Sequence, residues 1–332
     1  MKGRQTRRAL ASQIDAGPHG ALDIAATQDE TRPMQHAPRR RVFVLSSGRS
    51  IVADESGDPA AQPVVLLHGG GQTRHAWAGA ARALVAAGYR AIAMDHRGHG
   101  ESDWDPTGDY SVDGFANDLA EVVAQLDAPP VLVGASLGGI CALIVEGSAP
   151  SPVAKAIVLV DVTPRLEIPG VQRIIQFMAA RPDGFASLEE VADFVSSYMP
   201  HRARPADVRG LEKNLRRGAD GRYRWHWDPR LMQMWNPARF DPEEAQRIVE
   251  ERLALSRNIR VPVLLVRGRM SDVVSEEGAR EFLAVVPHAE YVDLAAAGHM
   301  VAGDTNDAFS RSVVDFIDRV VGRVGPSSPT GA

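Results

Sequence analysis

Residues 130–143 read PVLVGASLGGICAL, and this stretch decides the fold. A short apolar run leads directly into Ser136, and glycines lie on both sides of the serine. An apolar run of this length, bounded by a turn signal, is typical of a buried strand, and the residues that follow favour a helix. Two interpretations are open: Ser136 is a nucleophile, or the glycines only let a strand bend into a helix.

The pattern Gly-x-Ser-x-Gly occurs once in the chain, at residues 134–138. Between a buried strand and a helix, such a serine sits on a strained turn that presents its hydroxyl above the sheet. The small neighbours Ala135, Gly138 and Gly139 leave room for that turn. The helix would also direct its N-terminal amides and positive dipole end toward the site. The motif alone is weak, but in this position it predicts a nucleophile.

Composition favours a globular protein of ordinary size. The 332 residues are 44% hydrophobic and 24% charged, enough for one large core or for roughly two domains of about 150 residues each. The formal charge of -5 gives no reason to expect a nucleic-acid partner. Cys141 is the single cysteine, so an internal disulfide is excluded. With no apolar run of about 18 residues and no signal-peptide pattern, we expect a cytoplasmic protein that binds a small-molecule substrate and no membrane.

Short apolar runs alternate with amphipathic stretches from Val42 onward, which is the pattern of a mostly parallel sheet covered by helices. Two runs around Gly48 predict an antiparallel entry pair. The remaining expected strands are residues 63–69, 89–95, 130–136, 155–162, 261–268 and 289–295, with expected helices at 74–87, 112–127, 137–149, 275–286 and 304–322. The predicted fold class is α/β, with an eight-stranded, mostly parallel sheet flanked by helices.

The alternation of strand and helix patterns stops between Thr163 and Asn258. This segment has helical patches, several prolines and three tryptophans, so we expect a helical cap inserted over the carboxyl edge of the sheet, where open α/β sheets bind ligands. The expected organisation is a disordered tail at 1–40, a core at 41–162 and 259–324, a cap at 163–258 and a disordered end at 325–332.

A serine hydroxyl needs a base within hydrogen-bond reach and a third group that orients the base. If the chain order is serine, acid, histidine, the base lies beyond the strand at 261–268, which leaves His288 and His299. His299 follows the last expected strand, at the carboxyl edge that it would share with Ser136. It is therefore the preferred base.

Two aspartates compete as the orienting acid. Asp272 lies in the loop after the strand at 261–268, and Asp161 ends the strand at 155–162; we favour Asp272. For the oxyanion, the glycine loop LLHGGG at 66–71 offers the Gly70 N–H, and the N–H of Leu137 is the second expected donor. This loop matches neither phosphate-binding glycine motif, so no nucleotide cofactor is expected, and His68 is interpreted as fixing the loop.

Five segments together resemble the α/β-hydrolase fold superfamily, in its usual order and over nearly all of residues 42–323. They are LLHGGG (66–71), MDHRGHGESD (94–103), VGASLGG (133–139), LLVRGRMSD (264–272) and AAGHM (296–300). The most similar branch holds capped esterases, cofactor-free haloperoxidases or perhydrolases, carbon-carbon bond hydrolases and epoxide hydrolases. The resemblance implies a triad of Ser136, Asp272 and His299. Epoxide hydrolases and dehalogenases carry aspartate at the nucleophile position, so Ser136 argues against both activities.

The cap is expected to determine the substrate specificity. Residues 222–235, RYRWHWDPRLMQMW, supply enough apolar area to wall a pocket or to form the cap's own core. The candidate pocket residues are Trp225, Trp227, Trp235 and Met232. His96 and His99 have no third ligand nearby in sequence, so no metal is expected.

The first functional hypothesis is a serine hydrolase acting on a carboxylic ester, a lactone or a thioester through an acyl-enzyme. Perhydrolysis or carbon-carbon bond cleavage by the same triad is the alternative within enzymes. A ligand-binding relative without turnover is the alternative of another class.

Overall fold

The computed structural model describes residues 37–198, 204, 206–235, 241–295 and 307–322. The predicted tails therefore lie largely outside the described residues, although the first strand begins at Arg39. All described residues belong to one unit of the chain, which starts at His36.

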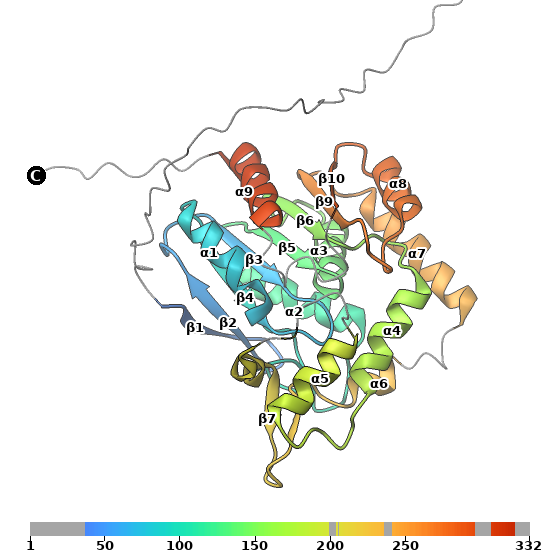
Figure 1. Cartoon of the computed structure of the whole chain (residues 1–332). Coiled ribbons are helices and arrows are strands. Elements are labelled where there is room, and N and C mark those ends of the chain that lie inside the picture. Colours follow the sequence, from blue (N-terminus) through green and yellow to red (C-terminus); the bar gives the residue numbers. More distant parts are fainter. Residues whose placement is uncertain (1–36, 199–203, 205, 236–240, 296–306, 323–332) are drawn as a thin grey trace, which may run out of the picture. The chain divides into compact units, whose positions relative to one another are not determined.

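An eight-stranded sheet forms the centre of this unit (Figure 1), in the order β1-β2-β4-β3-β5-β6-β9-β10. The strands are β1 (Arg39–Val44), β2 (Ser50–Ser56), β3 (Pro63–Leu67), β4 (Arg90–Met94), β5 (Val131–Ala135), β6 (Ala156–Val160), β9 (Val263–Gly268) and β10 (Glu290–Leu294). β2 pairs antiparallel with β1 and with β4, and all other neighbours are parallel. The predicted fold class is confirmed, and the six expected parallel strands agree to within two residues at each end.

Helices cover both faces of the sheet because its central strands are apolar on both sides. The short η1 (Arg74–Trp77), α1 (Ala78–Ala86) and α9 (Asp307–Val321) pack on one face, where Val64 and Leu66 meet Trp77 and Phe309. The other face carries α2 (Val112–Ala124), α3 (Leu137–Ser148), α7 (Pro242–Ser256) and α8 (Glu276–Val285). Among the described helices, none combines the length and apolarity that a membrane span requires.

The predicted helical insertion follows β6 (Figure 1). It contains α4 (Ile168–Ala179), α5 (Leu188–Tyr198), η2 (Val208–Asn214), β7 (Leu215–Arg217), β8 (Tyr223–Trp225) and α6 (Leu231–Met234). β7 and β8 form a small antiparallel sheet that the sequence did not reveal, since three-residue strands carry no alternation to recognise. The later helix α7 lies against α3 so closely that a Cβ on Gly147 would be 2.6 Å from the Leu255 carbonyl oxygen.

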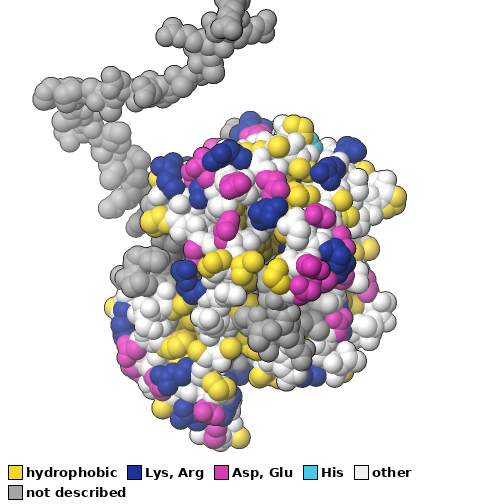
Figure 2. All heavy atoms as spheres, turned by 90° about the vertical axis from the view of Figure 1, so that its right-hand side faces the viewer, with side chains coloured by type: hydrophobic (Ala, Val, Ile, Leu, Met, Phe, Trp, Pro, Cys, Tyr) yellow, Lys and Arg dark blue, Asp and Glu magenta, His cyan; other side chains and the backbone are white. Residues whose placement is uncertain are grey.

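The surface of the insertion and of the neighbouring helices mixes charges of both signs. Figure 2 shows Lys and Arg side chains alternating with Asp and Glu on the face that is at the right of Figure 1. Many basic residues of the insertion have an acidic partner close in sequence, as in the pair of Arg224 with Asp220 at 2.6 Å. This face therefore presents no extended field of one sign.

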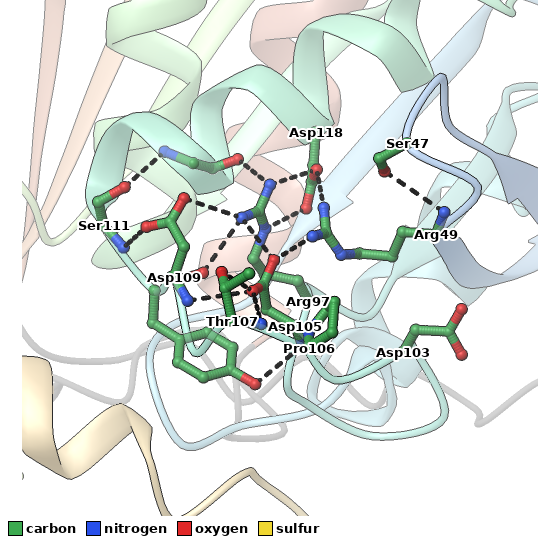
Figure 3. A network of polar contacts seen from close by, with 12 residues as sticks. Ser47, Arg49, Arg97, Asp103, Asp105, Pro106, Thr107, Asp109, Ser111 and Asp118 are labelled. Carbon is green, nitrogen blue, oxygen red and sulfur yellow. Dashed lines mark hydrogen bonds and ion pairs between the residues drawn. The ribbon is translucent and has the colours of Figure 1, made fainter.

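A buried ion network holds the turn after β4 against α2 (Figure 3). Arg97 binds both carboxylate oxygens of Asp118 at 2.6 Å and also donates to the Gly114 carbonyl oxygen at 2.8 Å. Arg49, from the turn between β1 and β2, donates to Asp118 at 3.1 Å and pairs with Asp105. Paired, hydrogen-bonded charges of this kind fix geometry, because removing one partner leaves the remaining buried charges incompletely matched.

Replacing Arg97 with alanine should destabilise the protein by about 3–5 kcal/mol, because Asp118 would stay buried without its bidentate partner. The measurement is urea unfolding followed by circular dichroism. Arg247→Ala is the matched control: Arg247 pairs with Glu244 and Glu251 on the exposed face of α7. Such a surface pair contributes about 0–1 kcal/mol, so equal losses in the two variants would contradict the assigned role of Arg97.

Candidate active site

Ser136 occupies a strained turn between β5 and α3. Its backbone has φ 48° and ψ −116°, and α3 begins at the next residue. A residue other than glycine in such a region costs of order 1–3 kcal/mol, which the surrounding contacts must offset. Within the continuous stretch 130–143, every residue except Ser136 is buried. The turn therefore raises this one side chain out of the core.

Three glycines make the turn possible by removing side-chain volume. A Cβ on Gly134 would lie 2.5 Å from the Gly138 carbonyl carbon, and one on Gly138 would lie 2.4 Å from the Leu67 carbonyl oxygen. A Cβ on Gly139 would lie 2.4 Å from Cγ1 of Val162. The helix, β5 and the end of β3 thus approach more closely than any side chain would allow.

The glycine loop after β3 lies beside Ser136, since a Cβ on Gly69 would be 3.3 Å from the Ser136 Cβ. The Gly69 N–H donates to Oε1 of Gln72 at 3.0 Å, and the Gly71 N–H donates to Nε2 of His99 at 3.1 Å. Between them, the Gly70 N–H has no hydrogen-bond partner in the part of the chain that the structure describes. The loop-fixing role of Gln72 was missed from the sequence, where nothing distinguishes it from a surface glutamine.

The Leu137 N–H is likewise without a hydrogen-bond partner among the described residues. As the first residue of α3, Leu137 has no intrahelical acceptor. Among the described residues, neither of the two amides predicted to bind the oxyanion has a partner, whereas the amides on either side of Gly70 donate to Gln72 and His99.

Three histidines pack together beneath the glycine loop. The ring centroid of His68 lies 4.6 Å from that of His96 and 5.1 Å from that of His99. Burial lowers the pKa of His96 to about 3 and that of His99 to about 4, and it also lowers the pKa of His68 well below its usual range. All three are therefore neutral near pH 7.

These neutral rings hydrogen-bond to the backbone. His68 accepts from the His96 N–H at 3.0 Å through Nε2, so its Nδ1–H donates to the Gly69 carbonyl oxygen at 2.8 Å. His99 accepts from Gly71 and donates through Nδ1 to the Arg97 carbonyl oxygen at 2.9 Å. The rings position the loop, as the sequence predicted for His68. Among the described residues, no three His, Cys, Asp or Glu side chains are arranged so that they could hold a metal ion.

The two candidate acids differ in environment. Asp161 follows β6, is fully buried, and accepts hydrogen bonds from the Gly268 N–H at 2.9 Å and the Ser271 hydroxyl at 2.5 Å. Asp272 lies in the loop after β9 with 37% of its side chain exposed, and it pairs with Arg173 of α4 at 2.6 Å. The predicted base, His299, lies outside the described residues.

The four predicted pocket residues lie in different surroundings. Trp225 stacks on Trp227 at a centroid distance of 4.9 Å and contacts aromatic rings of the insertion, among them Phe177 at 5.4 Å. Met232 is half-buried and packs against the core. Trp235 lies over the glycine loop, where a Cβ on Gly70 would be 2.9 Å from its Cζ3 atom.

Met178 of α4 also lies over the glycine loop, although the sequence gave no reason to single it out. A Cβ on Gly71 would be 3.0 Å from the Met178 sulfur. Trp235 and Met178 thus come from opposite ends of the insertion to cover the same loop. They form an apolar surface against Gly70 and Gly71.

A cavity of about 640 Å³ opens elsewhere between the core and the insertion. None of the predicted site residues lines it. Its lining residues are Arg40, Arg74, His75, Gly100, Glu101, Glu212, Lys213, Leu215, Arg216 and His226. Most of its lining residues are polar, and none of them belongs to the Ser136 turn.

Gly138→Ala should disrupt the turn, because the added methyl group meets backbone atoms that cannot rotate away. We expect a loss of about 1–3 kcal/mol in unfolding free energy by thermal or urea denaturation. Gly79→Ala in α1 is the control, since nothing lies within 4 Å of a Cβ at that position. Its effect should stay within about 1 kcal/mol, and comparable destabilisation of both variants would refute the close-packing account.

The sequence of the chain is similar to one protein family and to several known proteins. Residues 62–304 match the family model described as alpha/beta hydrolase fold. The chain is 31% identical over 267 residues to Esterase Rv0045c of Mycobacterium tuberculosis, covering 78% of this chain and 84% of the relative. It is 46% identical over 81 residues to non-heme chloroperoxidase CPO-A1 of Kitasatospora aureofaciens, covering 24% and 28% of the two chains.

Among solved structures, E-2-(acetamidomethylene)succinate hydrolase superposes with a TM-score of 0.73 at 22% identity. The superposition covers 85% of this chain and 99% of that chain. At this identity the likeness concerns the fold, and it agrees with the sheet order and the position of the insertion described above.

Proposed function

The chain belongs to the alpha/beta hydrolase fold family, and on that premise we propose that it is a serine hydrolase with an acyl-enzyme on Ser136. Its substrate would be a carboxylic ester, a lactone or a thioester. The observation that carries the proposal is the Ser136 turn, where a strained backbone raises one partly exposed hydroxyl from a buried strand and helix. The 31% identity to a protein named as an esterase supports the same class of reaction.

In the proposed reaction, Ser136 attacks the substrate carbonyl while His299 takes the hydroxyl proton. The N–H groups of Gly70 and Leu137 stabilise the negative charge that develops on the carbonyl oxygen. His299 then protonates the leaving alcohol or thiol, and the acyl group stays on Ser136. Water, deprotonated by the same base, releases the acid and restores the serine.

An aspartate at the same edge of the sheet orients the base and stabilises its charged form. The sequence favours Asp272 for this task. No cofactor and no metal take part in this scheme, since each step is a proton transfer or an attack on a carbonyl carbon.

Ser136→Ala should lower the turnover of p-nitrophenyl acetate by about 10⁴-fold or more, because the covalent step is lost. A fluorophosphonate probe should label the parent protein at Ser136 and leave the variant unlabelled. Ser148→Ala, at the exposed far end of α3, is the matched control and should keep the parent rate. Full activity of Ser136→Ala would rule out the proposed mechanism, and a parent protein that resists the probe would favour a binding protein without turnover.

Trp235 should limit the acyl chain, because its ring lies against Gly70, one of the two expected oxyanion donors. Trp235→Ala should shift the preference of the protein toward longer acyl chains in a series of p-nitrophenyl esters from acetate to decanoate. Trp104→Ala serves as control, since Trp104 is exposed and lies under Arg216. An unchanged chain-length profile in Trp235→Ala would exclude this residue from the acyl site.

Perhydrolysis is the second candidate, and the 46% identity over 81 residues to a named chloroperoxidase favours it. The same serine would form an acyl-enzyme that hydrogen peroxide, rather than water, releases as a peracid. Halide oxidation in the presence of acetate and peroxide would identify this activity. Cleavage of a carbon-carbon bond by the same residues is tested directly with ring-cleavage diketones.

A further inference from the structure

We propose that His226 of the insertion is a positioning residue for the glycine loop, and that it acts through Gly71, the neighbour of the expected oxyanion donor Gly70. The inference rests on the proposed function, because the Gly70 N–H has a role in the reaction only if Ser136 is the nucleophile. It gives the insertion a part in the chemistry in addition to covering the loop. The evidence is a set of hydrogen bonds between the insertion and the core, together with the burial of the His226 ring.

Three residues of the insertion bind one short turn of the core, residues 98–100. The Asp228 N–H donates to the Gly98 carbonyl oxygen at 2.8 Å, and Nη2 of Arg216 donates to the Gly100 carbonyl oxygen at 2.7 Å. Nδ1 of His226 accepts from the Gly100 N–H at 2.8 Å. Because these contacts bind backbone groups, they fix the path of the turn itself.

The middle residue of this turn holds the glycine loop. His99 lies between the two glycines, and its Nε2 accepts from the Gly71 N–H at 3.1 Å. Its ring centroid lies 5.8 Å from that of His226. The turn that the insertion binds is therefore the one that holds the Gly71 N–H.

The His226 ring is a buried hydrogen-bond donor. It is 2% exposed, and Nδ1 accepts from Gly100, so the neutral ring carries its proton on Nε2. Burial lowers the pKa of His226 well below its usual range and His99 lowers it further, whereas an interaction with the Gly71 backbone acts in the opposite direction. A backbone group that favours the protonated ring is a carbonyl oxygen, because an N–H would disfavour it. The ring therefore faces the Gly71 carbonyl oxygen.

The Nε2–H makes no hydrogen bond of good geometry with any of the residues that the structure describes. A buried donor without a partner costs free energy, which a small approach of the Gly71 carbonyl oxygen would recover. Hydrogen bonds of an active site are often long before the substrate binds and shorten in the transition state. With this contact shortened, Gly71 would be held at its N–H by His99 and at its carbonyl by His226.

In the proposed arrangement, negative charge develops on the substrate carbonyl oxygen beside the Gly70 N–H, and His226 keeps that N–H directed at the charge. His226 transfers no proton and does not touch the substrate. It donates a hydrogen bond to the loop from the insertion side, opposite in sequence to the contact that His99 makes from the core.

The test compares His226→Asn with His226→Gln, because the two amide side chains replace different ring nitrogens. Asparagine places its amide near the position of Nδ1, where it can still accept from Gly100 but cannot reach Gly71. Glutamine reaches the position of Nε2 and can donate there. His226→Asn should lower kcat for p-nitrophenyl acetate by about 10- to 100-fold with KM changed less than about threefold, because an oxyanion donor acts in the transition state. His226→Gln should restore kcat to within about threefold of the parent value.

A second readout uses a trifluoromethyl ketone, which forms a tetrahedral adduct with the nucleophile and places an oxyanion beside the Gly70 N–H. Its inhibition constant should rise by about the same factor as kcat/KM falls in His226→Asn, and it should stay near the parent value in His226→Gln. Arg224→Ala is the matched control, since Arg224 lies in β8, directly before this segment, and pairs with Asp220 inside the insertion. It should keep the parent kcat and inhibition constant. Thermal unfolding checks that each variant folds.

Parent-like kcat in a folded His226→Asn would overturn the inference. Equal losses in His226→Asn and His226→Gln would also overturn it, because the effect would then not depend on a donor at the Nε2 position. If His226→Asn fails to fold, His226→Phe, which keeps a ring and removes both nitrogens, is judged by the same criterion. Parent-like turnover in Ser136→Ala contradicts the proposed function itself, whereas the outcomes above, with Ser136→Ala inactive, contradict only the role of His226.

Discussion

The close approach of α3 to β5 and β3 is the constraint on which the rest of the site depends. Gly134, Gly138 and Gly139 leave no room for a single methyl group, and this lack of volume lets the chain turn at Ser136 with a positive φ. With any larger residue, the helix would move away from the sheet and carry the serine with it. The hydroxyl, the Leu137 amide and the helix dipole are thus positioned by one packing contact.

Other parts of the edge are fixed by polar groups that the solvent does not reach. Neutral histidines hold the glycine loop, while Arg97 and Asp118 tie the next turn to α2. Of these groups, His96, Arg97 and His99 belong to the turn that the sequence shows as MDHRGHGESD. The segment therefore acts as a scaffold for the loop that carries Gly70, which explains why its charged and aromatic residues lie outside the proposed chemistry.

The sheet and the Ser136 turn could be read from the sequence because their signals are local. Apolar runs marked the parallel strands, and a glycine pattern between strand and helix marked the serine. The environment of an aspartate is not local: Asp161 is buried by Ser271 and Gly268, more than a hundred residues further along the chain. For the same reason the sequence could not separate Trp235, which covers the glycine loop, from Trp225, which joins an aromatic cluster of the insertion.

The buried histidines also make the stability of the folded state depend on pH. In an unfolded chain each would bind a proton near pH 6.5, but burial keeps His96 neutral down to about pH 3 and His99 to about pH 4. Below pH 6.5 the unfolded state therefore binds more protons than the folded state, and stability declines by up to about 1.4 kcal/mol per pH unit for each such ring. The rings that hold the glycine loop at neutral pH thus make the protein sensitive to acid.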